Sequence, residues 1–422
     1  MIFITVKLNT MRHILYFSLL LTFLYSCKNA STMEETTNAS PTKGYISFQD
    51  DVDFLKQYTD VEVLTALLGN GMVAVSGNLQ GRVMTSTSNG EQGRSYGWIN
   101  RALFESRDTL DHMNPFGGEE RIWLGPEGGQ YSIFFPQGAE FVFEDWQTPP
   151  LIDTEPYDLV QKTAQKAVYT KSGSLTNYSG FTFEFNIKRS IEILTTPKIF
   201  QTLGIAEKEG INSVGYRTTN ELTNTGEADW QKETGLLSIW LLGMFTPTEA
   251  TMVVIPFEAD AEGPIVNDTY FGKVPAERLK TGENVLFFSG DGKYRSKIGL
   301  PPGRAKNILG AYDPLSKTLT IVKFSKPKGV NDYVNSLWEM QDDPYGGDVV
   351  NSYNDGPVEP GGEAMGPFYE LETSSPALAL KAGESGTHTQ QTYHFSGNEG
   401  MLNEIAELLL GVSLSDIEWA FE

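Results

Sequence analysis

Short apolar segments bounded by turn residues recur along most of the chain. Gly, Pro, Asn or Asp ends most of these segments, and several alternate apolar and polar positions with period two, as a half-buried strand does. The clearest example places Phe181, Phe183, Phe185 and Ile187 on one face of a strand and polar residues on the other. The segments with strand character lie at residues 72–77, 82–88, 96–100, 121–125, 131–135, 140–144, 167–175, 181–194, 213–224, 235–245, 251–257, 285–290, 318–324, 367–383 and 388–397.

Helical patterns are confined to the two ends of this series. Residues 51–68 predict one helix and one strand, and residues 401–410 carry apolar side chains at helical spacing, with Gly411 as the stop. No fixed repeat period is present, which disfavours propellers and solenoids. No low-complexity linker follows residue 45, so we expect one large all-β domain over residues 46–422, with a few short helices.

The amino terminus has the pattern of a secretory signal. Arg12 precedes an apolar stretch at residues 14–24, which is too short for a convincing membrane span. The sequence Leu-Tyr-Ser-Cys at residues 24–27 resembles a bacterial lipobox, and Cys27 is the only cysteine of the chain. We therefore expect Cys27 to be lipidated and to become the first residue of the mature protein.

Three further expectations follow from this signal. Translation is expected to start at Met11, because residues 1–10 form an unusual extension. Residues 1–27 are the predicted signal peptide, and the Ser/Thr-rich residues 28–45 a flexible tether. The protein is then exported and lipid-anchored in the bacterial cell envelope, with either the periplasm or the outer-membrane surface open as its location.

Composition and charge narrow the possible partners. The 422 residues are 40% hydrophobic and carry a formal net charge of −22, which disfavours a nucleic-acid partner. A single cysteine excludes disulfides within the chain, thiolate zinc sites and iron–sulfur clusters. No phosphate-binding Gly-rich loop, G-x-S-x-G elbow or H-E-x-x-H motif is present, and we expect no cofactor.

Two pairs of residues separated by one position combine polar chemistry with a shared strand face. Arg121 and Trp123 are suited to a sugar, because a guanidinium donates to hydroxyls or a carboxylate while an indole stacks on C–H groups. The alternative is an ion pair of Arg121 with Glu119 or Glu127 beside a core tryptophan. Glu370 and Glu372 form the second pair, in which a like-charged neighbour can raise one pKa and create a general base; a solvated strand edge is the alternative.

Histidines are scarce, so each is a candidate for proton transfer. His388 and His394 are six residues apart and face the same way on an unbulged strand, and either is a possible acid. Hydrogen-bonded structural histidines are the alternative. A zinc site would require His112 to converge with both.

Further polar positions complete the inventory of a carbohydrate site. Lys293, Arg295 and Lys297 place three cations on a turn-rich segment, where they suit a carboxylate or sulfate or else balance the acidic surface. Aromatic rings and side-chain amides supply the remaining candidate substrate contacts, namely Asn220, Trp240, Asn351, Tyr353 and Asn354. Calcium is an alternative for a group of carboxylates without EF-hand spacing, namely Asp342, Asp343, Asp348 and Asp355.

Three stretches, in order, resemble the galactose mutarotase-like (aldose 1-epimerase-like) superfamily. Residues 117–129 contain a G-x-R-I-type strand with Arg121, and residues 215–227 resemble the central strand with L-T-N. Residues 368–395 are similar to the end of such proteins, with Glu372 in an E-T-x-x-P setting followed by a closing strand. We expect this chain to belong to an uncharacterised lipoprotein group within the superfamily.

The resemblance implies a β-supersandwich of two large, mostly antiparallel sheets that binds a sugar on a concave face. It also implies that Glu372 is the general base and Arg121 a substrate contact. Neither region that carries a histidine in the epimerases has one here, so His388 or His394 is the expected acid. The predicted function is epimerase-like or lyase-like carbohydrate processing, with non-catalytic glycan binding as the alternative.

Overall fold

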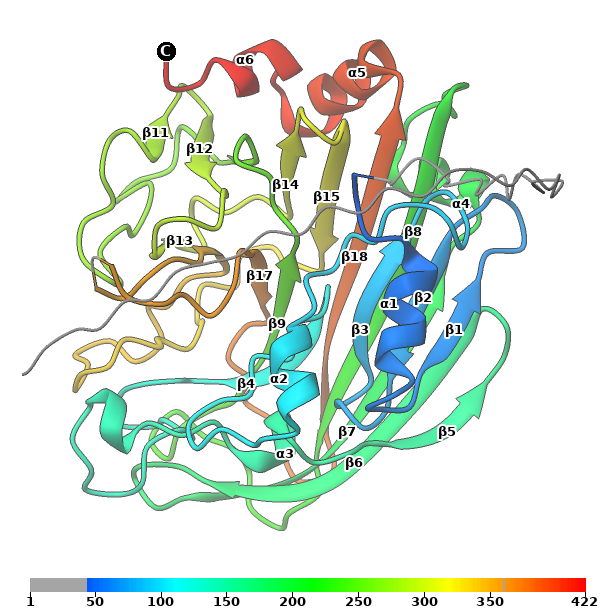
Figure 1. Cartoon of the computed structure of the whole chain (residues 1–422). Coiled ribbons are helices and arrows are strands. Elements are labelled where there is room, and N and C mark those ends of the chain that lie inside the picture. Colours follow the sequence, from blue (N-terminus) through cyan, green and yellow to red (C-terminus); the bar gives the residue numbers. More distant parts are fainter. Residues whose placement is uncertain (1–43, 360) are drawn as a thin grey trace, which may run out of the picture. The chain divides into compact units, whose positions relative to one another are not determined.

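The period-two segments form antiparallel β-strands arranged in three sheets (Figure 1). The computed structural model describes residues 44–359 and 361–422, and Tyr45–Glu422 belong to one unit of the chain. The predictions for the signal peptide, for lipidation of Cys27 and for all of the tether up to residue 43 lie outside the described residues. Among the described residues, no helix is long and apolar enough to cross a membrane.

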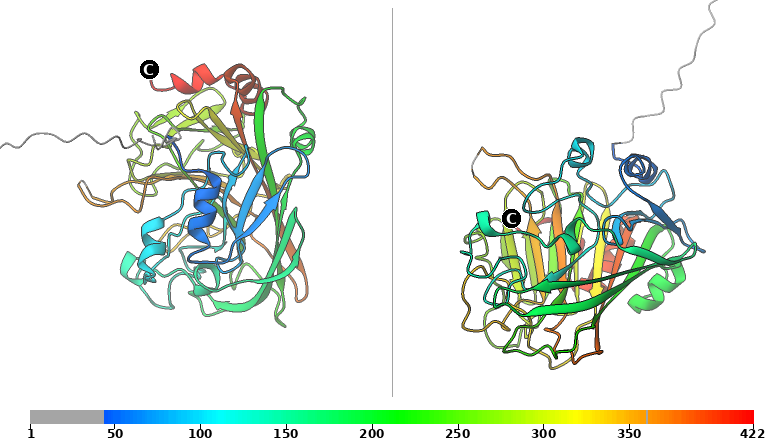
Figure 2. Two further views of the ribbon diagram at one scale, coloured as in Figure 1. Left: turned by 45° about the vertical axis from the view of Figure 1, so that its right-hand side comes forward. Right: turned by 90° about the horizontal axis from the view of Figure 1, so that it is seen from below.

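The largest sheet has ten strands, and Figure 2 shows it from two further sides. Alternation is clearest in β7, where every second residue from Phe183 to Ile193 is buried, as predicted. In spatial order the strands are β11 (Leu279–Thr281), β12 (Val285–Ser289), β10 (Met252–Pro256), β14 (Ile308–Asp313), β15 (Thr318–Phe324), β18 (Ser385–Gly397), β8 (Ile211–Asn224), β7 (Thr182–Ile193), β6 (Lys166–Thr176) and β5 (Asp158–Lys162).

Two smaller sheets accompany the ten-stranded one. The five-stranded sheet contains, in spatial order, β13 (Ser296–Leu300), β16 (Val350–Asn354), β17 (Tyr369–Ser374), β9 (Ser238–Phe245) and β4 (Arg121–Gly125). The three-stranded sheet consists of β1 (Glu62–Thr65), β2 (Met72–Ser76) and β3 (Arg82–Thr87). All pairings between the named strands of the described residues are antiparallel, which confirms the predicted all-β class with two large antiparallel sheets.

The helices are short, as predicted. They are α1 (Phe48–Leu55), α2 (Arg101–Ser106), the 3-10 helix η1 (Phe143–Asp145), α3 (Pro150–Asp153), α4 (Thr196–Leu203), α5 (Glu399–Leu410) and α6 (Leu414–Glu418). Helix α5 ends at Gly411, whose left-handed φ of 77° gives the predicted stop. Apolar side chains of α4, α5 and α6 cover one face of the ten-stranded sheet over β14, β15 and β18.

The opposite face of the ten-stranded sheet packs against the five-stranded sheet. Val253 and Val322 of the larger sheet share one buried cluster with Ile298 and Leu371 of the smaller one. Apolar side chains at every second position of the facing strands fill this layer, so the intervening positions of the five-stranded sheet face away from the ten-stranded sheet. Most of the residues predicted for the site lie at these intervening positions.

Some predicted strands are absent from the structure. Residues 96–100, 131–135 and 140–144 contain no strand, and the latter two belong to a loop with η1. Phe134 and Phe135 of this loop are buried, so their apolar character reflects packing in place of strand pairing. Conversely, β5, β11, β13, β14 and β16 lie in segments where the pattern predicted no strand.

Candidate functional site

One face of the five-stranded sheet gathers most of the predicted site residues. The strand register places Glu372 opposite Asn351 on one side and Leu242 on the other, and Leu242 in turn lies opposite Arg121. Tyr353 is paired in the same way with Glu370 and Lys297. Side chains directly opposite each other in a ladder point to the same face, so these positions share the face that points away from the ten-stranded sheet. The predicted residues that this outer face carries are Arg121, Trp123, Trp240, Lys297, Asn351, Tyr353 and Glu372.

Glu372 lies at the centre of the outer face and is fully buried. Its Oε2 atom accepts hydrogen bonds from Trp240 Nε1 and Lys297 Nζ, each at 3.0 Å. Its Oε1 atom is buried and has no hydrogen-bond partner among the described residues. The Glu372 carboxyl group is therefore held through one oxygen, and its other oxygen is not engaged by the described residues.

Arg121 joins β4 to β17 through Glu370. Its Nη2 atom lies 3.0 Å from Glu370 Oε1, and its guanidinium stacks on the ring of Trp123, 4.3 Å from the ring centroid. The partner of Arg121 is therefore Glu370 and neither Glu119 nor Glu127. Burial raises the pKa of Glu370 most strongly; the Arg121 charge opposes this, the Glu372 charge reinforces it, and the resulting pKa is about 7.

Lys297 is enclosed by aromatic rings and carboxylates. Its Nζ lies 4.8 Å from the Trp240 ring centroid and 5.6 Å from that of Tyr270. Burial acts to lower the pKa of Lys297, but Glu372, Glu127 and Glu370 together raise it above the usual value. Lys297 is thus a fixed positive charge at neutral pH that counters the carboxylates.

Two loops cover part of this face. The loop after β4 carries Glu127, whose backbone N–H donates to Ser336 Oγ at 3.2 Å. Phe134 of the same loop packs on Trp123 with ring centroids 5.4 Å apart. Burial raises the pKa of the Glu127 carboxyl, and Glu372 adds to the effect while Lys297 opposes it.

The sequence analysis did not select Glu127 or Tyr270 for this site. Glu127 lies two residues after the end of β4 and could have been found from its place after the Arg121 strand. Tyr270 lies in an irregular loop between β10 and β11, where no periodicity marks it. Its hydroxyl donates to Asp348 Oδ2 at 2.5 Å, and burial raises the pKa of Asp348 to about 6.

The structure places the remaining predicted residues away from Glu372. His388 is fully buried on β18, between the sheets, where Nε2 lies 2.9 Å from Thr373 Oγ1, and burial lowers its pKa to about 3. Asn220 accepts from Arg189 at 2.5 Å in the same buried layer. Asn354 lies on the inner side of β16 and bonds to the backbone of residues 292 and 294. Arg295 stacks on Phe271 just before β13. The geometry is that of structural contacts for His388, Asn220 and Asn354.

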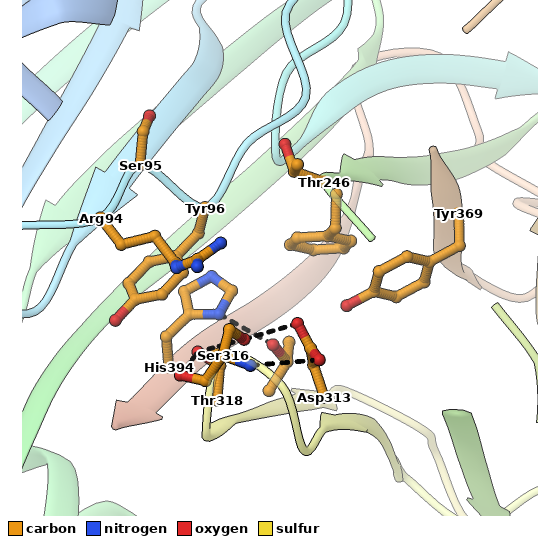
Figure 3. A pocket seen from close by; sticks show the side chains of 11 residues that line it. Arg94, Ser95, Tyr96, Thr246, Asp313, Ser316, Thr318, Tyr369 and His394 are labelled. Carbon is orange, nitrogen blue, oxygen red and sulfur yellow. Dashed lines mark hydrogen bonds between the residues drawn. The ribbon is translucent and has the colours of Figure 1, made fainter. Parts of the chain in front are cut away.

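His394 lines a separate small cavity, shown in Figure 3. Its ring stacks on Tyr96 with centroids 4.3 Å apart, and its two nitrogens lie 3.1 Å from Glu119 Oε2 and 2.9 Å from Thr320 Oγ1. The cavity measures about 20 Å³, which is room for about one water molecule. His394 therefore occupies a hydrogen-bonded pocket between loops and strands that the outer face does not share.

A larger hollow of about 280 Å³ lies on the solvent side of the ten-stranded sheet. It is lined by Lys166, Ser190, Glu192, Arg217, Thr219 and Thr389. Glu192 and Arg217 pair with each other at 2.8 Å across neighbouring strands. The hollow contains no aromatic side chain and no buried unpartnered carboxylate, so it lacks the features of the outer face.

Metal ligands do not converge in the part of the chain that the structure describes. Within residues 44–359 and 361–422, no group of three or more His, Cys, Asp or Glu side chains is arranged to hold a metal ion. Of the aspartates considered for calcium, Asp348 bonds to Tyr270 and Asp355 accepts from Tyr353 at 3.0 Å.

Comparison with known proteins places the chain in a family. Residues 46–421 match the model of a family of unknown function, DUF6786. The chain belongs to this family. No curated protein matches it.

Solved structures that resemble this member of DUF6786 do so at low sequence identity. One is an Escherichia coli K12 protein proposed to be an aldose 1-epimerase, with 11% identity, a TM-score of 0.47, and coverage of 80% of this chain and 100% of that chain. Another is a galactose mutarotase-like protein from Lactobacillus casei, with 11% identity, a TM-score of 0.45, and coverage of 79% and 100%. Both carry the name of the superfamily whose motifs the sequence resembles. The likeness concerns the fold alone.

Proposed function

We propose that this protein binds a carbohydrate on the outer face of the five-stranded sheet and processes it by proton abstraction at Glu372. One observation carries the proposal: three buried polar atoms of this face lack a partner among the described residues, namely Glu372 Oε1, Trp123 Nε1 and Arg121 Nε. Buried polar groups are normally hydrogen-bonded, and an unmet donor or acceptor costs about 1–3 kcal/mol. A ligand with hydroxyl groups would satisfy both the donors and the acceptor.

The surroundings of these atoms match a sugar. Trp123 and Trp240 supply flat apolar surfaces next to charged groups, with ring centroids 5.6 Å apart. Sugars present C–H faces and hydroxyl edges, and sites that combine aromatic rings with a few convergent polar groups recognise both. The superfamily resemblance of the sequence implies the same ligand class.

Glu372 would act as the base in either of two reactions. Epimerisation at the anomeric carbon starts with loss of the anomeric hydroxyl proton, and elimination next to a uronate starts with loss of a C–H proton. Lys297 holds Glu372 Oε2 in place, so Oε1 would receive the proton. Lys297 and Arg121 would also offset negative charge that develops on the sugar.

Non-catalytic glycan binding is the second candidate. It is favoured by the position of both predicted histidine acids, which bond to Thr373 and Glu119 on the inner side of the ten-stranded sheet, away from Glu372. A binding protein would use the same tryptophans without any proton donor.

Glu372→Gln separates the two candidates, with the exposed Glu283→Gln as the matched control. The probes are D-glucose and D-galactose, followed by NMR exchange between anomers, and polygalacturonate and alginate, followed by the absorbance of unsaturated products. An enzyme loses at least about 100-fold in turnover in Glu372→Gln while calorimetry still detects sugar binding. Binding with no turnover in the unchanged protein supports the second candidate, and absence of both refutes the proposal.

We also propose that the protein is a lipoprotein of the bacterial envelope, anchored through Cys27. The support is the lipobox-like sequence that ends in the single cysteine. Metabolic labelling with a fatty acid, followed by detergent phase partition, should label the full-length chain and fail in Cys27→Ala. Label retained by Cys27→Ala would refute the anchor.

A further inference from the structure

Both reactions considered for Glu372 need a proton donor as well as a base. When the anomeric hydroxyl loses its proton, the ring oxygen must gain one as its bond to the anomeric carbon breaks. In elimination, the oxygen of the departing sugar must gain one. A donor within reach of the same substrate typically contributes about 100- to 10,000-fold to such a step.

The side chains closest to Glu372 are poor donors. The indole N–H of Trp240 donates hydrogen bonds but does not give up its proton. Lys297 has a pKa raised by the surrounding carboxylates, so it retains its proton at neutral pH. His388 and His394 bond to Thr373 and Glu119 elsewhere in the fold.

Glu370 lies where a donor is needed. It precedes Glu372 by two residues on β17, so their side chains share a face, with α-carbons about 7 Å apart. A sugar ring that contacts Glu372 would therefore also reach Glu370. Arg121 Nη2 donates to Glu370 Oε1 at 3.0 Å, which fixes the carboxyl group and leaves its other oxygen as the one that can carry a proton.

We propose that Glu370 is the catalytic acid that complements Glu372, with Arg121 as its positioning residue; this inference rests on the proposed function. In anomer exchange, Glu372 takes the proton of the anomeric hydroxyl and a carbonyl forms at the anomeric carbon. The bond from that carbon to the ring oxygen breaks, and the ring oxygen takes the proton of Glu370. Ring closure on the other face of the carbonyl reverses both transfers and returns each carboxyl group to its initial state.

The same pair serves elimination. Glu372 takes the proton from the carbon next to the uronate carboxylate, and its electron pair forms the carbon–carbon double bond. The bond to the departing sugar oxygen breaks, and Glu370 protonates that oxygen. Glu372 then returns its proton to solvent and Glu370 takes one up, so each turnover conserves protons without a cofactor.

The electrostatics of the face support this division of roles. Burial raises the pKa of Glu370 most, the charge of Glu372 adds to that effect, and the resulting value of about 7 leaves a large protonated fraction at neutral pH. Arg121 continues to donate to the carbonyl oxygen of the neutral acid. Two neighbouring carboxyl groups with different environments are a known way to obtain an acid and a base at one pH.

Glu127 is the competing candidate, because it is also a carboxyl group close to Lys297 and Glu372. It lies on a loop, and its side chain bonds to Trp338. Glu370 lies within a strand, and Arg121 holds it from β4. Glu127→Gln is therefore the matched control for Glu370→Gln.

The test compares Glu370→Gln, Glu370→Asp and Glu127→Gln with the unchanged protein, using the sugar probe that is turned over. We expect the unchanged protein to lose activity above about pH 7. Glu370→Gln should lower kcat about 100-fold or more with little change in KM, and it should lack this alkaline loss of activity. Glu370→Asp should retain part of kcat and the alkaline limb of the pH profile. Circular dichroism and thermal unfolding establish that each variant is folded.

Three results would overturn this assignment. One is a Glu370→Gln variant with unchanged kcat and pH profile, and another is a Glu127→Gln variant that alone removes the alkaline limb. In both cases an inactive Glu372→Gln variant leaves the proposed function intact. The third is the absence of turnover with all probes, which ends the proposed enzyme function and this inference together. If Glu370→Gln does not fold, the pH profile of Glu370→Asp decides the question. An alkaline limb shifted from that of the unchanged protein supports the assignment, and an identical limb overturns it.

Discussion

Arg121 Nη2 and Glu370 Oε1 lie 3.0 Å apart although 249 residues separate them in the chain. The two side chains are only 4% and 6% exposed, and strand β9 runs between the strands that carry them. This pair links the first strand of the five-stranded sheet to the last one formed along the chain. This ion pair therefore connects the candidate site to the pairing of β4, β9 and β17.

Removing Arg121 should destabilise the protein strongly. Above its pKa of about 7, the buried Glu370 carboxylate loses its cation in Arg121→Gln, and losing one partner of a buried ion pair costs about 3–5 kcal/mol. Urea unfolding measures this cost. The double variant Arg121→Gln with Glu370→Gln should recover part of it, because two neutral amides can bond to each other. A loss in the double variant equal to the sum of the losses in Arg121→Gln and Glu370→Gln would show that the pair is not coupled.

Much of this face could be predicted from local sequence. Residues two apart in a strand share a face, so Arg121 with Trp123, and Glu370 with Glu372, were correctly paired. Which strands become neighbours depends on long-range pairing, which no local pattern encodes. Lys297 illustrates the gap, because its strand β13 is five residues long and the sequence marks it only as a cation-rich turn.

For the histidines, the sequence predicts a shared face but not the direction of that face. Their spacing correctly predicts that His388 and His394 point the same way on one strand. It cannot say which face that is, because β18 lies in the middle of the ten-stranded sheet with apolar cover on one side and polar networks on the other. Both side chains face the polar layer between the sheets, where Thr373 and Glu119 hold them.

The two tryptophans of the outer face should respond differently to the same substitution. Trp240→Phe removes the N–H that Glu372 Oε2 accepts at 3.0 Å, and a hydrogen bond to a charged group is worth about 1.5–3 kcal/mol. Trp123→Phe removes an N–H with no partner among the described residues, so unfolding free energy should change by less than about 1 kcal/mol beyond the packing loss.

If Trp123 Nε1 donates a hydrogen bond to the sugar, Trp123→Phe should weaken sugar binding more than Trp240→Phe does. Trp123→Phe should then weaken binding, measured by calorimetry, more than it weakens the fold. Equal stability losses in the two variants would contradict the assignment of Trp240 as the partner of Glu372.

The loop that carries Glu127 depends on a close backbone approach. A Cβ added at Gly128 would lie 2.3 Å from the carbonyl oxygen of Leu337, so the two loops over the outer face would have to separate. Gly128→Ala should lower the unfolding free energy by about 1–3 kcal/mol, the usual range for overpacking. Gly303→Ala is the control, because a Cβ there meets nothing within 4 Å. Similar thermal unfolding of both variants would show that the loops yield without cost.

Acid should weaken the fold through His388. Burial holds its pKa at about 3 in the folded protein, against 6.5 for the ordinary side chain. Between these values the unfolded chain binds a proton that the folded protein does not, so stability falls as pH falls below 6.5, by about 1.4 kcal/mol per pH unit from this residue.

His388→Gln cannot titrate, so the slope of its unfolding free energy between pH 6.5 and about pH 4.5 should be smaller by that amount. Thr373→Val removes the 2.9 Å contact but keeps the histidine, and it should retain the slope. Parallel urea-unfolding profiles of His388→Gln and the unchanged protein would show that His388 takes up its proton equally in both states, and hence that the layer between the sheets admits water.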